Sequence, residues 1–160
     1  MGGLSSNLQQ AKAAIAHVKR KLPRGAGNRS DGSSDAAECV LWIRENMVSA
    51  AEWVPHLAAR AEQMGCGNCG EQAAVAYMFL KKRGVRPLNY MNLNNPAGKA
   101  VHSFVVIAFE GDSETQSSWG ENAVICDPWD DSQAYAAWKI GANMSLWVGG
   151  STVESLFRRD

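Results

Sequence analysis

Apolar residues in the first part of the chain recur every three or four positions, which is the period of an α-helix. The first series predicts an amphipathic helix over residues 7–22. Its apolar face consists of Leu8, Ala11, Ile15, Val18 and Leu22. Pro23 and the glycine- and serine-rich segment 24–35 then interrupt the pattern. We therefore expect residues 1–34 to form a helical arm and linker, and residues 35–160 to form the main domain.

Two shorter helical patterns follow the linker. Ser34 or Asp35 can cap a helix that extends through Asn46. The buried side of this helix would consist of Cys39, Ile43 and Met47, together with Trp42. The second pattern predicts a helix over residues 49–63, which Pro55 either interrupts or starts late.

The run CGEQAAVAYMFLKKRG, residues 69–84, contains no helix breaker before its last glycine. Cys69, Ala73, Ala76 and Leu80 fall at i, i+4, i+7 and i+11, so they lie on one face of a predicted helix. Lysine and arginine at 81–83 suit the negative end of the helix dipole. Cys69 is therefore expected in the first turn of a buried helix, where the positive end of the dipole favours the thiolate form.

After residue 84 the pattern changes to that of β-strands. Residues 85–93 have strand propensity, and residues 94–99 read as a turn. The segment 101–109 is almost entirely apolar or β-branched, which predicts a central strand with His102 near its start. A short apolar strand over residues 123–126 ends at Asp127. Because helices come first and strands later, we predict an α+β fold.

Composition limits the classes of function. The 160 residues carry 16 basic and 16 acidic side chains with no long basic run, so a nucleic-acid partner is not indicated. No window approaches the roughly 18 apolar residues of a stable membrane span. Four cysteines are too few for a disulfide scaffold, so we expect free thiols in a reducing compartment. The start MGGLSS fits the N-myristoylation pattern at Gly2, although a flexible tail has the same composition.

Cys66 and Cys69 lie at C-x-x-C spacing within the stretch GCGNCGEQ, which has three interpretations. A redox dithiol of the thioredoxin type follows a β-strand, whereas the residues before Cys66 read as helix and loop. A structural zinc site needs a second close pair of ligands, and the other cysteines and histidines do not supply one. The third interpretation makes Cys69 a nucleophile and leaves Cys66 as a small residue in a tight turn.

A nucleophilic cysteine needs a base within hydrogen-bond reach and a third group that orients the base. His17 belongs to the predicted arm, and His56 follows a proline in a helical stretch. His102 begins a hydrophobic strand, which is a rigid position for an imidazole. Asp127 ends the next strand, so two neighbouring antiparallel strands would bring the two side chains together. We therefore predict a catalytic set of Cys69, His102 and Asp127, with no metal and no cofactor.

This order of residues resembles the papain-like and transglutaminase-like superfamily of cysteine enzymes. In that superfamily a nucleophilic cysteine opens a central helix, and a histidine and an aspartate or asparagine follow on strands. The segments NCGEQA, HSFVVI and VICDPW are similar in particular to small papain-like domains of bacterial toxins and secreted effectors. The likeness spans residues 63–129. It implies a papain-like catalytic domain over residues 35–160, in which helices pack on a mainly antiparallel sheet.

The resemblance also implies roles for supporting residues. Gln63 precedes Cys69 by the interval that separates the oxyanion-hole glutamine from the nucleophile in papain-type proteases. Asn68 belongs to a small polar turn into the helix, and Trp129 would shield the histidine pair. The chain departs from the cathepsin type after the nucleophile, where Gly70 and Glu71 stand, and backbone N–H groups of the helix are an alternative oxyanion site.

The activity implied is hydrolysis of an amide bond in a target protein through an acyl-enzyme. We favour a cysteine protease, and a glutamine deamidase or a transglutaminase on the same scaffold remains the alternative. The family likeness implies secretion by a bacterium into the cytoplasm of a target cell, and a cognate immunity protein if the target is another bacterium. A C-x-x-C redox protein and an inactive papain-like binding domain are hypotheses from other classes.

Overall fold

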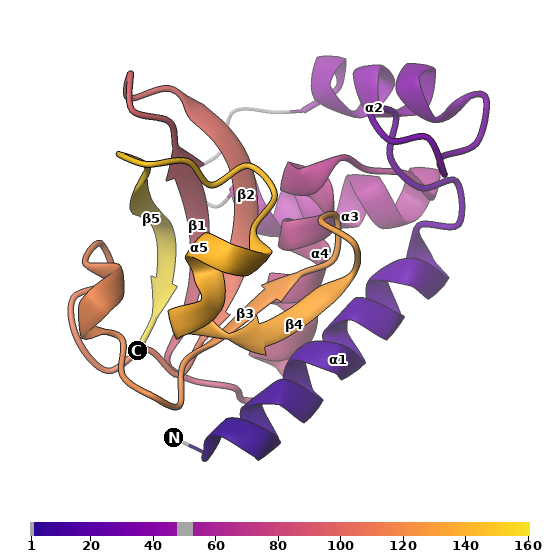
Figure 1. The fold of residues 1–160 in the computed structure, drawn as a ribbon. Coiled ribbons are helices and arrows are strands. Elements are labelled where there is room, and N and C mark those ends of the chain that lie inside the picture. The colour runs from indigo at the N-terminus through magenta and orange to yellow at the C-terminus, as the bar shows by residue number, and fades with distance from the viewer. Residues whose placement is uncertain (1, 48–52) are drawn as a thin grey trace.

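The computed structural model describes residues 2–47 and 53–160, and in these ranges the helices precede most of the strands (Figure 1). The helices are α1 (Leu4–Lys21), α2 (Ala36–Glu45), α3 (Trp53–Met64), α4 (Cys69–Lys82) and α5 (Ile140–Asn143), and two short 3₁₀ turns are η1 (Gln116–Ser118) and η2 (Ala137–Lys139). The strands are β1 (Leu88–Asn94), β2 (Ala100–Ile107), β3 (Val124–Asp127), β4 (Gln133–Ala136) and β5 (Thr152–Arg159). The prediction of an α+β fold is confirmed.

The five strands form one antiparallel sheet with the order β4-β3-β2-β1-β5. Strand β2 lies in the middle, as its uninterrupted apolar sequence predicts. Its side chains alternate between two apolar clusters, with Val105 and Ile107 on the helical side and Phe104 and Val106 on the other. Because both faces of β2 are buried, the strand lacks the alternation of apolar and polar residues that a one-sided strand shows.

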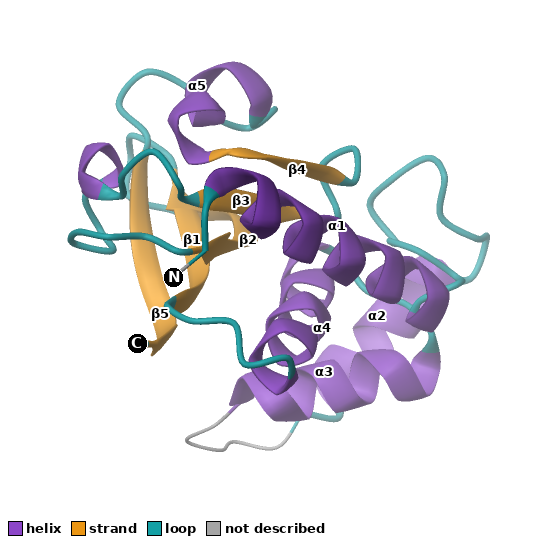
Figure 2. Cartoon of the chain, turned by 90° about the horizontal axis from the view of Figure 1, so that it is seen from below, coloured by secondary structure: helices purple, strands orange, loops and turns teal. Residues whose placement is uncertain are grey.

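Helices α1 and α4 lie together on one face of the sheet, and α3 packs against α4 (Figure 2). The other face is covered by the segment after β2, which contains the fully buried Trp119, and by η2 and α5. Among the described residues, no helix is long and apolar enough to cross a membrane.

Helix α1 is part of the core rather than an arm separate from it. Its buried side chains share one apolar cluster with α4 and with strands β2 and β3; they are Ala11, Ala14, Ile15 and Val18. The sequence correctly located the apolar face of this helix, but it did not show which surface that face packs against. An amphipathic helix buries its apolar face against a complementary apolar surface. Here α4 and the sheet provide that surface. The division at residue 34 therefore does not separate two packing units.

Several element bounds differ from those expected. The helix predicted from about Ser49 begins at Trp53 in the described residues, with Pro55 in its first turn, and the rest of its predicted start lies outside them. Strand β1 begins at Leu88 rather than at residue 85. Trp42, expected on the buried side of α2, is 37% exposed, whereas Ile43 is fully buried. Strands β4 and β5 were not predicted, because short or half-polar edge strands carry little periodic signal.

Candidate functional site

The turn before α4 fixes the position of Cys69. Helix α3 ends at Met64 and is followed by Gly65, whose φ of +75° is a left-handed conformation that glycine adopts readily. A Cβ atom at Gly67 would lie 2.5 Å from the Cβ of Glu71, so only glycine fits there. The Gly67 amide donates to the Gly25 carbonyl at 3.0 Å, and the Gly27 amide donates to Asn68 Oδ1 at 2.8 Å. The loop that follows α1 thus holds the turn from which α4 starts.

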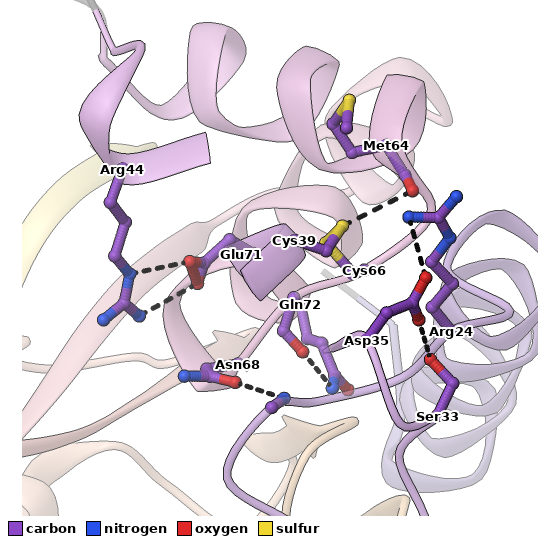
Figure 3. Close-up of a disulfide and its surroundings, with 12 residues drawn as sticks. Arg24, Ser33, Asp35, Cys39, Arg44, Met64, Cys66, Asn68, Glu71 and Gln72 are labelled. Atoms are coloured by element: carbon purple, nitrogen blue, oxygen red, sulfur yellow. Dashed lines mark hydrogen bonds and ion pairs between the residues drawn. A yellow bond between two sulfur atoms is a disulfide. The ribbon is translucent and has the colours of Figure 1, made fainter. Parts of the chain in front are cut away.

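Helix α2 is joined to this turn on both sides of Cys69 (Figure 3). Three residues before it, Cys66 forms a disulfide with Cys39. Two residues after it, the buried Glu71 accepts two hydrogen bonds from Arg44, from Nε at 2.9 Å and from Nη2 at 3.2 Å. The start of α4 is therefore held by one covalent and one ionic link to the same helix.

The disulfide corrects two expectations drawn from the sequence. Free thiols were predicted throughout, but only Cys69 and Cys126 are free. Cys66 was interpreted as a small residue in a turn, whereas it is bonded to Cys39, 27 positions earlier. Since Cys66 pairs with Cys39, it is not the partner of Cys69 that a C-x-x-C dithiol requires. Spacing alone points to the nearest cysteine, and only the packing of α2 shows which one is within bonding distance.

Strands β2 and β3 bring His102 and Asp127 together. Val105 is paired with Cys126 across the two antiparallel strands, so the start of β2 lies beside the end of β3. His102 Nε2 and Asp127 Oδ2 are 2.6 Å apart, and both side chains are almost completely buried. The second imidazole nitrogen, Nδ1, is buried and has no hydrogen-bond partner among the described residues. One nitrogen thus contacts Asp127, and the other has no hydrogen bond to any described residue.

The electrostatic surroundings favour the charged imidazole. Burial by itself lowers the pKa of His102, but the hydrogen bond and negative charge of Asp127, together with the nearby Cys69 thiol, raise it to about 10. Burial raises the pKa of Asp127, while the hydrogen bond from His102 opposes that change. Cys69 is free and partly exposed, and its thiol contributes to the raised pKa of His102. A partly exposed sulfur beside a buried histidine–carboxylate pair is the arrangement of an activated nucleophile.

An aromatic ring covers the histidine pair. The Trp129 ring centroid lies 5.2 Å from that of His102. Its indole Nε1 donates to Asn28 Oδ1 at 2.8 Å, and the Arg29 guanidinium stacks 4.8 Å from the ring centroid. The loop after α1 therefore positions the tryptophan, which reduces the access of water to the His102–Asp127 hydrogen bond.

Of the predicted site residues, the structure brings Cys69, His102, Asp127 and Trp129 together. Asn68 adjoins Cys69, but its side-chain oxygen is occupied by the Gly27 amide. Gln63 lies exposed on α3, where it accepts a hydrogen bond from Arg60 at 3.2 Å. The turn at Gly65 separates α3 from α4, so the spacing in sequence does not carry Gln63 to the thiol.

Sequence reasoning did not identify several residues that build the site. Tyr90 of β1 is buried and donates to the Gly70 carbonyl at 3.0 Å, in the first turn of α4. Gln72 donates to the Gly67 carbonyl at 2.9 Å. Asp130 is buried behind Asp127, and the run DPWDD was the only sign of it in the sequence. These contacts join segments that are distant in sequence or lie inside loops, where periodicity gives no information.

His102, Asp127 and Asp130 each offer a potential ligand atom for a cation, and these atoms lie within 4.8 Å of one another. Asp127 Oδ2 and His102 Nε2 are already engaged with each other at 2.6 Å. We therefore describe the three groups as a buried hydrogen-bonded charge network. What this network can do chemically is withdraw a proton from Cys69 and retain it on the imidazole.

Comparison of the chain with protein-family models, with curated proteins and with solved structures gives no match.

Proposed function

We propose that this protein is a thiol-dependent amide hydrolase in which Cys69 is the nucleophile, His102 the general base and Asp127 the orienting acid. The observation that carries the proposal is the buried pair of His102 and Asp127 at 2.6 Å, together with a free, partly exposed thiol at the start of a helix that contributes to the raised pKa of His102. A buried histidine with a purely structural role would have hydrogen-bond partners for both ring nitrogens, whereas Nδ1 of His102 has none among the described residues. The combination fits the Cys-His-Asp constellation of nucleophilic catalysis.

In the proposed reaction, Nδ1 of His102 takes the proton of the Cys69 thiol, and the thiolate attacks the carbonyl carbon of an amide. The first-turn N–H groups of α4 have no partners within the helix, and they would stabilise the oxyanion of the tetrahedral intermediate. The imidazolium then gives its proton to the leaving amine, and the C–N bond breaks to leave a thioester on Cys69. A water molecule, deprotonated by His102, hydrolyses the thioester and restores the thiol.

The substrate class we favour is the backbone amide of a target protein, which makes the enzyme a protease of papain-like architecture. The support is the order of Cys, His and Asp on a helix start and two strands, together with the tryptophan that covers the histidine. Attack on a glutamine side chain, with water or with an amine, is the alternative on the same residues. A bacterial toxin or secreted effector acting in the cytoplasm of a target cell is the proposed setting, with a cognate immunity protein as the inhibitor.

The test is mass spectrometry of host and bacterial proteomes after exposure to the protein and to Cys69→Ala. New peptide termini that require Cys69 identify a protease, conversion of Gln to Glu a deamidase, and isopeptide cross-links a transglutaminase. His102→Ala and Asp127→Ala should abolish the same product, whereas the exposed His56→Ala is the matched control and should not. If all three site variants retain the toxicity of the unsubstituted protein, the proposal is wrong and a binding function remains.

A further inference from the structure

Asp130 lies three residues after Asp127 and is 1% exposed, yet the proposed reaction gives it no role. Its backbone N–H donates to Asp127 Oδ1 at 3.3 Å, which is the carboxylate oxygen that does not contact His102. Its own Oδ2 accepts a hydrogen bond from the Ser145 amide at 2.8 Å. Its Oδ1 is buried and has no hydrogen-bond partner among the described residues. A second carboxyl group is therefore buried directly behind the first.

A buried carboxylate without a counter-ion is unfavourable, because the charged form loses its hydration. Folded proteins rarely bury a carboxylate unless a cation is paired with it. Here a ligand atom of His102 lies within 4.8 Å of both carboxyl groups, so the imidazolium is the cation that both carboxylates face. Asp130 thus adds a second buried negative charge close to Asp127 and His102.

We infer that Asp130 is a further positioning residue of this site, whose buried carboxylate acts through Asp127 to hold His102 in the imidazolium form. The catalytic meaning of this inference rests on the proposed function, since an imidazolium is the proton donor to the leaving amine. Burial is the largest cause of the raised pKa of Asp127, and the negative charge of Asp130 raises it further. The hydrogen bond from His102 acts in the opposite direction. Asp127 and Asp130 therefore act as a pair with His102 between them and the thiol.

Other charged or titratable groups interact with the network itself or with Cys69 and Trp129 next to it, and they stay unchanged in the test. They are Cys69 and Glu71 from α4, Arg44 from α2, Tyr90 from β1, Tyr135 from β4 and Arg29 beside Trp129. Tyr135 interacts electrostatically with both carboxyl groups, and its hydroxyl has no hydrogen-bond partner among the described residues. None of them changes when Asp130 alone is substituted.

The experiment is an NMR titration of the His102 imidazole in Cys69→Ala, which removes coupling to the thiol. The chain has only three histidines, so single His17→Gln and His56→Gln variants assign the resonances. Asp130→Asn removes the charge but keeps an oxygen that can accept the Ser145 hydrogen bond. Asp131→Asn is the matched control, because Asp131 is the adjacent carboxylate and is exposed in an ion pair with Arg29.

We expect Asp130→Asn to lower the His102 midpoint by about one unit or more, the range for loss of an opposite charge at about 4–6 Å, while Asp131→Asn changes it much less. A decrease in Asp130→Asn no larger than that in Asp131→Asn would overturn the inference. If Asp130→Asn fails to fold, the ¹³C shift of the Asp130 carboxyl in Cys69→Ala decides instead. A carboxylate shift at the pH values where His102 is charged supports the inference, and a protonated carboxyl there overturns it.

The titration involves no substrate, so its outcome is independent of which amide is attacked. If proteome mass spectrometry finds no Cys69-dependent product while His102 still responds to Asp130→Asn, the proposed function fails and the charge network stands. If the product is found but His102 does not respond, the inference alone fails.

Discussion

Removal of the Arg44 guanidinium should destabilise the protein more than removal of its partner Glu71. Glu71 is 1% exposed, and both of its oxygens accept hydrogen bonds from Arg44, whose side chain is 54% exposed. Arg44→Met leaves a buried carboxylate without its counter-charge, which costs about 3–5 kcal/mol when both partners are buried. Because Arg44 is half exposed and water can partly replace it, we expect about 2–3 kcal/mol.

Urea denaturation at equilibrium measures this difference in four proteins, namely the unsubstituted chain, Arg44→Met, Glu71→Gln and the double variant. At this chain length, each kcal/mol lost corresponds to about 2–4 °C in melting temperature. The double variant should be more stable than Arg44→Met, because a neutral glutamine needs no counter-charge. Arg60→Met is the control, since Arg60 hydrogen-bonds Gln63 at the surface and its loss should cost less than about 0.5 kcal/mol.

The reasoning is refuted if Arg44→Met costs no more than Arg60→Met, or if the losses in the two single variants simply add in the double variant. Additive losses would mean that the carboxylate and the guanidinium do not stabilise each other. Because Glu71 is two residues from Cys69, the rate of Cys69 alkylation by iodoacetamide should also change in Arg44→Met. A change in stability with an unchanged alkylation rate would confine the pair to a structural role.

Four further predictions concern the site and its supports. Since the pKa of His102 is raised to about 10, the rate of amide hydrolysis should stay constant through neutral pH and decline as the imidazolium loses its proton near pH 10. A decline of the rate centred near the ordinary histidine pKa of about 6.5 would contradict the pairing with Asp127. Because the pKa of His102 is raised on folding, the stabilisation that His102 contributes is fully present below about pH 6.5 and is lost as the pH rises toward 10. In urea titrations, the difference in unfolding free energy between the unsubstituted chain and His102→Gln should therefore shrink over that interval. The Cys39→Ser/Cys66→Ser variant opens a loop of 27 residues and should lose about 3–4 kcal/mol of unfolding free energy, and equal stability of the two proteins under non-reducing conditions would show that the link is not formed. Gln63→Ala should leave both turnover and stability unchanged, because Gln63 contacts Arg60 at the surface; a large loss of turnover would instead restore its assignment to the oxyanion site.

The sequence by itself determined helices α1 to α4 and strands β1 to β3, and it drew attention to the side chains at the start of α4 and at the ends of β2 and β3. The apolar stripe of α4 placed Cys69 in its first turn, and the strand that starts near His102 was readable because a strand buried on both faces is continuously apolar. Asp127 was singled out because it ends the next strand along the chain, and consecutive strands tend to be neighbours in a sheet. In each case the information lies within one element or between adjacent elements.

The tertiary structure decided every contact between segments that are far apart in the chain. Helix α1 packs on α4 and the sheet, Cys66 bonds to Cys39, and Arg44 forms an ion pair with Glu71. The apolar periodicity of each segment shows only that one of its faces is buried. The physical reason is that an apolar stripe specifies burial without specifying its partner, while a disulfide or an ion pair requires distances that only packing sets. Asp130 shows the same at short range, because the sequence does not reveal that its carboxyl group is buried beside Asp127.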